Sequence, residues 1–199
     1  MSQSNNIRIT RQANKALGLL IRSFQTGLRS SNFNTKTLLT TYNANVRSIL
    51  EYGSVVWAGV AKSHAERVER VQHKFLMWLN CHTIQPCISL TYHSLLQHFG
   101  VQSLSSRRVQ HDLLFLKSIF SLKISSEILL NCFGLHAPTR STRNLRLFAE
   151  PRGRVETVAS GFLCRMPRLA NQFLTATNSD FLAIHIAYLE LKLSDIPKT

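Results

Sequence analysis

A helical repeat of apolar side chains in residues 36–52 limits what this chain can fold into. The repeat advances in steps of three and four residues, and polar side chains fill the positions between. This spacing predicts one amphipathic helix with a single buried face. The β-branched and aromatic run Val55, Val56, Trp57 follows it and needs a partner surface to cover it. The apolar residues of the repeat are Leu38, Leu39, Tyr42, Val46, Ile49 and Leu50.

Similar patterns predict helices along most of the chain. Asn34 is a suitable N-cap, and Ser63 with Glu66 three residues on has the form of a capping box. Gly53 and Gly100 are placed to end helices. The fold class we expect is mainly α, a helical bundle. The expected helices cover residues 7–28, 34–52, 63–79, 92–99, 103–122, 126–131, 165–175 and 179–193.

The pattern changes near residue 132, where glycine, proline and arginine interrupt the helical periodicity. We therefore expect a helical domain over residues 1–131. An irregular basic segment with C-terminal helices follows over residues 132–199. Short extended pieces are expected at 145–148 or 155–159. A chain of 199 residues is long enough for one ordinary core and a smaller appended unit.

Positive charge is the strongest compositional feature of the chain. There are 24 Lys and Arg residues against 10 Asp and Glu, for a net charge of +14. An excess of this size favours a polyanionic partner, with nucleic acid ahead of a membrane surface, because each neutralised phosphate releases counterions. The alternative is a merely solvated basic surface, which we rank second because residues 1–31 contain no acid at all. We expect no small-molecule substrate and no membrane partner.

The cations of residues 7–28 gather on one side of the expected helix. A step of about 100° per residue places them opposite an apolar face that includes Leu17 and Leu20. A mitochondrial transit peptide has the same composition, so this stripe alone leaves both interpretations open. The candidate nucleic-acid-binding residues are Arg8, Arg11, Lys15 and Arg22 in the stripe, and Arg140, Arg143 and Arg146 in the acid-poor segment further on.

Residue patterns that catalysis requires are missing from the sequence. Asp112, Asp180 and Asp195 each stand apart from other carboxylates, whereas two-metal phosphoryl transfer needs them clustered. There is no glycine-rich phosphate loop, nucleophile elbow or His-Glu-x-x-His helix. Cys81 and Cys87 have five residues between them, rather than the two to four usual for structural zinc. We expect no enzyme activity of the chain itself, no metal and no cofactor.

The four cysteines occur in a chain without a secretory signal peptide, which predicts free thiols and no disulfide framework. The expected location is intracellular, nuclear or cytoplasmic, with mitochondrial import still open. No apolar run approaches the roughly 20 residues that cross a bilayer. The aromatic side chains Tyr42, Tyr52, Trp57 and Trp78 have the spacing of core residues, which we favour over stacking platforms for bases.

The segment Val46 to Trp57, VRSILEYGSVVW, resembles a signature of non-LTR (LINE-type) retrotransposon reverse transcriptases that lies downstream of their catalytic palm. Further segments fit the same family in the same order, so the resemblance covers nearly the whole chain. They are ANKALG at 13–18, VERVQHKFL at 68–76, residues 113–119, PTRSTRN at 138–144 and RMPRLAN at 165–171.

The resemblance implies a thumb-like helical region and the segment after it, which in such polymerases grip the primer–template duplex. The family's Tyr-x-Asp-Asp palm motif, second metal-binding aspartate, endonuclease domain and Cys-Cys-His-Cys knuckle are missing here. Polymerase activity is therefore not carried over, and no catalytic residue maps onto this chain. We expect a non-catalytic fragment or orphan reading frame that binds RNA or an RNA–DNA hybrid. The alternative is a helical protein-interaction scaffold derived from a mobile element, with no nucleic-acid role.

Overall fold

The computed structural model describes residues 2–27, 34–59, 62–83, 90–136, 146–151, 153, 155–177 and 181. These residues are mainly helical, as expected. Their extended pairing is one isolated antiparallel bridge between Leu135 and Phe148. Within the described part of the chain, no helix is both long enough and apolar enough to cross a membrane. The expected helix at 179–193 lies outside the described residues except for residue 181, so it is not tested.

The chain divides into two compact units, residues 1–105 and 106–199. The expected division lay later, between 131 and 132. Side chains after Ser105 contact segments beyond residue 132: Asp112 pairs with Arg165, and Phe120 packs against Phe148. These contacts explain why residues 106–131 group with the second unit.

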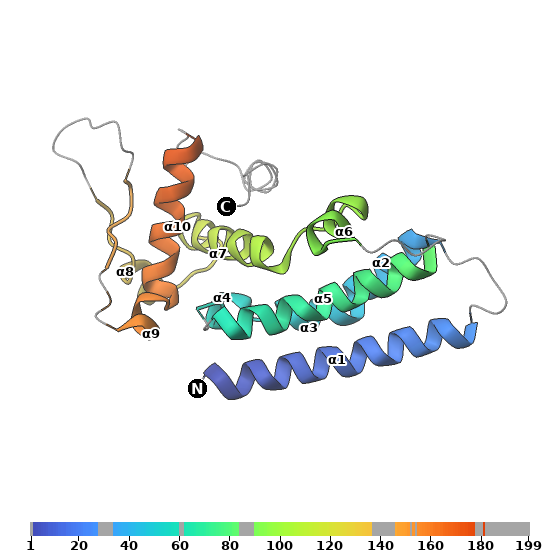
Figure 1. The fold of residues 1–199 in the computed structure, drawn as a ribbon. Helices are drawn as coiled ribbons and strands as arrows, with labels where there is room; N and C mark the ends of the chain where they lie inside the picture. Colours follow the sequence, from blue (N-terminus) through green and yellow to red (C-terminus); the bar gives the residue numbers. More distant parts are fainter. Residues whose placement is uncertain are drawn as a thin grey trace. The chain divides into compact units, whose positions relative to one another are not determined.

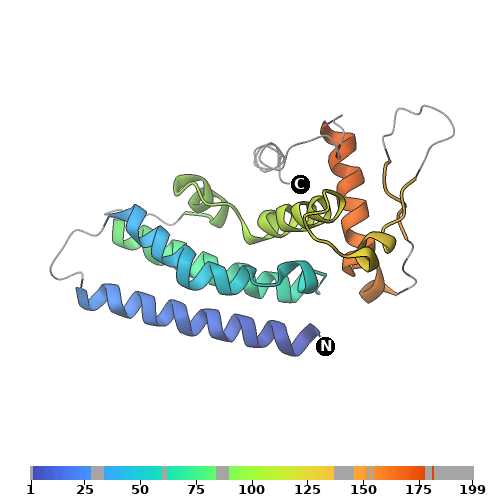
Figure 2. The same cartoon turned by 180° about the vertical axis from the view of Figure 1, so that it is seen from behind.

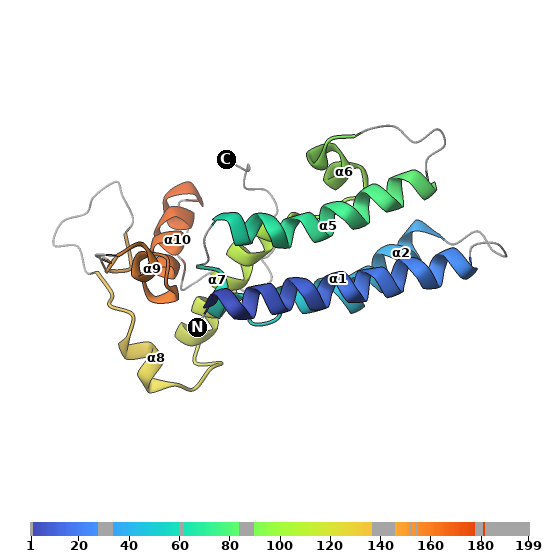
Figure 3. The ribbon, with the colours of Figure 1, turned by 60° about the horizontal axis from the view of Figure 1, so that its bottom comes forward.

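In the first unit, α1 (Ser2–Gly27) lies lengthwise beside α5 (Lys62–Thr83) (Figures 1 and 3). It also packs against a helical rod made of α2 (Thr35–Tyr42), η1 (Asn43–Arg47) and α3 (Ser48–Glu51), seen from behind in Figure 2. The contact face of α1 is the predicted one, because Ala13, Leu17 and Leu20 are buried. The described residues of the first unit therefore form a layered helical bundle around one apolar cluster.

The rod contains a π-helical turn at η1 that the sequence pattern did not predict. Its buried residues Leu38, Tyr42, Val46 and Leu50 are each four positions apart. In a regular α-helix, a four-residue step overshoots a full turn by about 40°, so three such steps would rotate the last residue away from the core. The wider π turn takes up this overshoot and keeps all four side chains on one face.

The helix ends in the first unit follow the expected residues in part. The Asn34 side chain accepts a hydrogen bond from the Lys36 N–H and caps α2. Gly53 and Gly100 adopt left-handed φ values of 62° and 61°, where they end α3 and α6 (Tyr92–His98). The capping box was wrong, because α5 already begins at Lys62 and Ser63 lies inside its first turn.

The run Val55–Trp57 is helical rather than extended, within α4 (Ser54–Trp57). Trp57 is buried and donates its indole N–H to the Tyr52 carbonyl oxygen at 2.8 Å. Val56 is 81 % exposed and Tyr52 is 83 % exposed, so the expectation of a core position was wrong for Tyr52. The left-handed turn at Gly53 redirects the chain between Tyr52 and Trp57 and leaves the Tyr52 ring in solvent.

In the second unit, α10 (Phe162–Thr177) runs across α7 (Leu104–Phe120), with α8 (Glu127–Asn131) and α9 (Glu156–Ala159) nearby (Figures 1 and 2). The expected extended piece at 155–159 was wrong, because residues 156–159 form the single turn of α9. Arg165 joins the helices by donating two hydrogen bonds to the buried Asp112 carboxylate, at 2.7 and 3.1 Å. Burial raises the pKa of Asp112, and the Arg165 hydrogen bonds oppose that shift.

Asn171 on α10 completes the extended pairing at residue 148. The bridge to Leu135 uses the backbone groups of Leu147 and Ala149, which leaves the Phe148 N–H and carbonyl facing the other way. The buried Asn171 amide bonds both, at 3.0 and 2.9 Å, and also donates to Glu150 at 2.8 Å. One side chain thus replaces a neighbouring strand.

Cysteine chemistry differs from the expectation of free thiols. Cys132 and Cys164 are free, but Cys81 is disulfide-bonded. Cys81 is exposed in the last turn of α5. The prediction of no disulfide was therefore wrong for this residue.

Replacing Asn171 with alanine leaves the buried backbone N–H and carbonyl of Phe148 without partners. We expect Asn171→Ala to lower the free energy of unfolding by about 2–4 kcal/mol in urea denaturation. Gln172→Ala, at the exposed neighbouring position, is the control and should change it by less than about 0.5 kcal/mol. Equal effects of the two substitutions would contradict this role of Asn171.

Candidate nucleic-acid interface

The cationic stripe of α1 lies on its exposed face. Arg8, Arg11, Lys15 and Arg22 are all exposed, opposite the face that packs into the core. Arg22 already takes part in a contact with a neighbouring group. The sequence thus placed these side chains on the correct face, and their role in binding stays a prediction.

Two of these cations line an open groove between α1 and α5. Its volume is about 580 Å³, and its residues come from one face of each helix. Arg11 and Lys15 occupy one wall, and Arg67 and His64 occupy the other. The lining residues are Ile7, Thr10, Arg11, Asn14, Lys15, His64 and Arg67.

The groove has an uncompensated positive charge. Among the residues that the structure describes, its lining contains three cations and no carboxylate. Among the described residues, Arg11, Lys15 and Arg67 make no hydrogen bond or ion pair. Arg11 and Lys15 are also four positions apart on α1, where like charges repel. A phosphate between the helices would relieve this repulsion and satisfy the cationic donors.

Sequence reasoning missed Arg67 and His64 as part of this surface. Arg67 follows Glu66 on a polar helix face of mixed charge, which is the usual pattern of a solvated surface. Only the pairing of α5 with α1 brings Arg67 to the groove. Nothing in the local sequence marks it.

The candidates in the second unit have separate outcomes. Arg140 and Arg143 lie outside the described residues. Arg146 is exposed and lines two cavities together with Arg168, a residue that the sequence did not single out. Arg168 lies in the α10 segment, which we had predicted as a helix and as part of the family resemblance but not as a binding surface.

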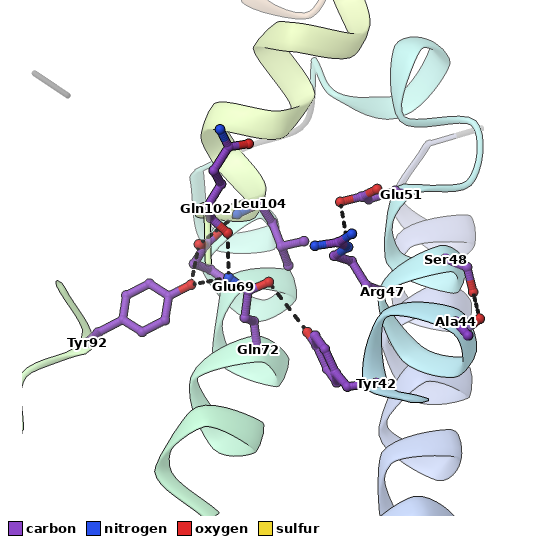
Figure 4. Close-up of polar contacts among 10 residues, drawn as sticks. All are labelled: Tyr42, Ala44, Arg47, Ser48, Glu51, Glu69, Gln72, Tyr92, Gln102 and Leu104. Atoms are coloured by element: carbon purple, nitrogen blue, oxygen red, sulfur yellow. Dashed lines mark hydrogen bonds and ion pairs between the residues drawn. The ribbon is translucent and has the colours of Figure 1, made fainter. Parts of the chain in front are cut away.

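A partly buried polar cluster surrounds Glu69 on α5 (Figure 4). The Glu69 carboxylate accepts the backbone N–H groups of Leu104 and Ser105, at 3.0 and 3.2 Å, and so caps the start of α7. It also accepts the Tyr92 hydroxyl at 2.5 Å. Glu69 therefore joins α5, α6 and the beginning of α7.

Gln72 extends the cluster across the core of the first unit. Its side-chain N–H group donates to the Tyr92 hydroxyl at 3.1 Å and to the Gln102 carbonyl at 2.9 Å. Its oxygen accepts the Tyr42 hydroxyl at 3.5 Å, and the Tyr42 ring stacks on Phe75 with centroids 4.0 Å apart. Each of these groups has a hydrogen-bond partner within the protein, so the cluster holds helices together.

Burial raises the pKa of both hydroxyls in this cluster. For Tyr42 desolvation is the main cause, and for Tyr92 desolvation is followed by the charge of Glu69 and the hydrogen bond to it. Both tyrosines keep their protons in the folded state at pH values where a tyrosine in the unfolded chain ionises.

We expect stability to fall as the pH rises above about 10. The pKa values of Tyr42 and Tyr92 are raised in the folded state. The stability that the two protonated hydroxyls contribute is therefore complete below the unfolded pKa of 10.0 and is lost as the pH rises above it. Urea midpoints at pH 8 and pH 11 measure the effect, and the double variant Tyr42→Phe/Tyr92→Phe should show a smaller drop between them. An unchanged drop in the double variant would contradict the assignment.

In the described part of the chain, no group of three or more His, Cys, Asp and Glu side chains is arranged to hold a metal ion. Two histidines near Cys81 in the sequence make other contacts: His82 bonds the Trp78 carbonyl at 2.8 Å, and His93 bonds Gln97 at 3.2 Å. Each contact lies within the residue's own helix.

Comparison with protein-family models, with curated proteins and with solved structures found no match to this chain.

Proposed function

We propose that this chain is a non-catalytic, mainly helical piece of a LINE-type reverse transcriptase that binds the backbone of RNA or of an RNA–DNA hybrid. The observation that carries the proposal is the groove between α1 and α5, where Arg11, Lys15 and Arg67 meet and no described lining residue is a carboxylate. The resemblance at residues 46–57 supports the parent class. Such a role places the protein in the nucleus or cytoplasm.

The length of the stripe suits a repeating anion. Arg8 and Arg22 are 14 positions apart, which is about 21 Å along an α-helix. Successive phosphates of one strand are about 3.4 Å apart along a duplex axis, so the stripe spans roughly six of them. Lysine and arginine side chains on that scale bind a backbone without reading its sequence.

We expect the protein to bind a short RNA–DNA hybrid at low salt, with an affinity that falls steeply as salt is added. The double variant Arg11→Glu/Lys15→Glu should weaken binding at least tenfold and reduce the slope of log K against log salt by about 2, because two phosphate contacts are lost. Fluorescence anisotropy at several salt concentrations measures both quantities.

Lys36→Glu is the matched control, because Lys36 is exposed on α2 and does not line the groove. Lys36→Glu should weaken hybrid binding less than the double variant does, because it changes only a charge outside the groove. Absence of binding at low salt, or binding indifferent to salt, would refute the proposal.

Exposed apolar side chains favour a second candidate function, a helical protein-interaction scaffold. Tyr52 is 83 % exposed and Val56 is 81 % exposed, on either side of the turn at Gly53. Binding through these side chains should survive charge reversal at Arg11 and Lys15, whereas binding through the groove should not.

A further inference from the structure

A second cationic site lies in the second unit and shares no lining residue with the α1–α5 groove. Two adjoining cavities of about 490 and 550 Å³ share Arg146, Glu150 and Arg168 as lining residues. Arg146 precedes the extended segment that pairs with Leu135, and Arg168 lies on α10. Two guanidinium groups from separate elements therefore border the same space.

Asn171 fixes the backbone positions from which both arginines extend. Arg168 precedes it by three residues on α10, so the two lie on neighbouring positions of one helix face. Arg146 precedes Phe148 by two residues, and both backbone polar groups of Phe148 are bonded to Asn171. The distance between the two arginine backbones is thus set by a buried contact rather than by surface loops.

Arg146 and Arg168 differ from Arg165 in whether their charge is compensated. Arg165 is matched by the two oxygens of Asp112 and by the Ser160 carbonyl. Among the described residues, by contrast, Arg146 and Arg168 make no hydrogen bond or ion pair. Glu150 lines the same cavities, but its Oε1 accepts the Asn171 amide and it forms no ion pair with either arginine in the described part of the chain.

We propose that Arg146 and Arg168 together bind one phosphodiester group. Among the described residues that line both cavities, two arginines and one glutamate carry a net charge of +1, which one phosphodiester neutralises. The planar guanidinium group donates two parallel hydrogen bonds to phosphate oxygens, so two of them can hold one phosphate from both sides. The choice of ligand rests on the proposed nucleic-acid binding, but Arg146 and Arg168 do not line the α1–α5 groove.

The test measures hybrid binding by anisotropy for the full chain and for Arg146→Gln, Arg168→Gln and the double variant. Each single variant should bind about three- to tenfold more weakly and lose about 0.9 from the salt slope. The double variant should bind more weakly than either single variant. Its loss of affinity should be smaller than the product of the two single losses, because both side chains hold one phosphate. Lys123→Gln, an exposed cation outside both cavity linings, should bind like the wild type. Helical circular dichroism and melting temperature should match in all variants.

Failure of this proposal is distinguishable from failure of the proposed function. If Arg11→Glu/Lys15→Glu weakens hybrid binding while Arg146→Gln/Arg168→Gln behaves like Lys123→Gln, the second site is refuted and the groove stands. If the wild type does not bind the hybrid, a titration with inorganic phosphate tests the second site by itself. If phosphate shifts the NMR signals of arginine side chains and the shift disappears in the double variant, Arg146 and Arg168 form a site for free phosphate. If phosphate causes no shift, the site is refuted.

Discussion

The carboxylate of Glu69 is the interaction on which the first unit depends most. It supplies the acceptor for the first backbone N–H groups of α7 and for the Tyr92 hydroxyl at the same time. An exposed capping residue would satisfy the helix end alone. Here the cap comes from the middle of α5, so the start of α7 and the position of α6 are both tied to that helix. Gln72, one turn further along, repeats the connection through Tyr92 and the Gln102 carbonyl.

The basic groove follows from the way α5 is fixed. Val68 is buried in the core, and Arg67 directly before it, about 100° away around the helix, is exposed and lines the groove with α1. On α1 the same division separates buried Ala13 and Leu17 from exposed Lys15. When two amphipathic helices pack lengthwise, the polar edges beside their contact come together. In the described part of the chain no acid lines this edge beside the cations, and this makes the edge a surface for an anion.

Periodicity predicted most of the helices because burial and helical geometry act over neighbouring residues. It placed the buried face of α1 correctly and identified Asn34 as a cap. The π turn at 43–47 was not predicted, since it depends on how four-residue steps accumulate over the whole rod. The turn at 156–159 was mistaken for an extended piece, because four residues are too few to show a period.

The candidate sites show the same limit. The stripe on α1 was visible because its residues share one helix, whereas Arg67 and Arg168 join their sites through packing between elements distant in sequence. The disulfide of Cys81 was missed because cysteine number and cellular context, rather than geometry, led to that expectation. Tyr52 was misplaced because its ring direction is set by the left-handed turn at Gly53.

The most direct test of the account compares Arg67→Gln with Arg70→Gln in hybrid binding. Both residues are exposed arginines on α5 and differ in that Arg67 lines the groove and Arg70 does not. If the groove binds a backbone phosphate, Arg67→Gln should weaken binding about three- to tenfold and lower the salt slope by about 0.9, while Arg70→Gln changes both much less. Equal losses from the two substitutions would mean that the protein attracts nucleic acid only through its net charge, and would contradict a specific interface between α1 and α5.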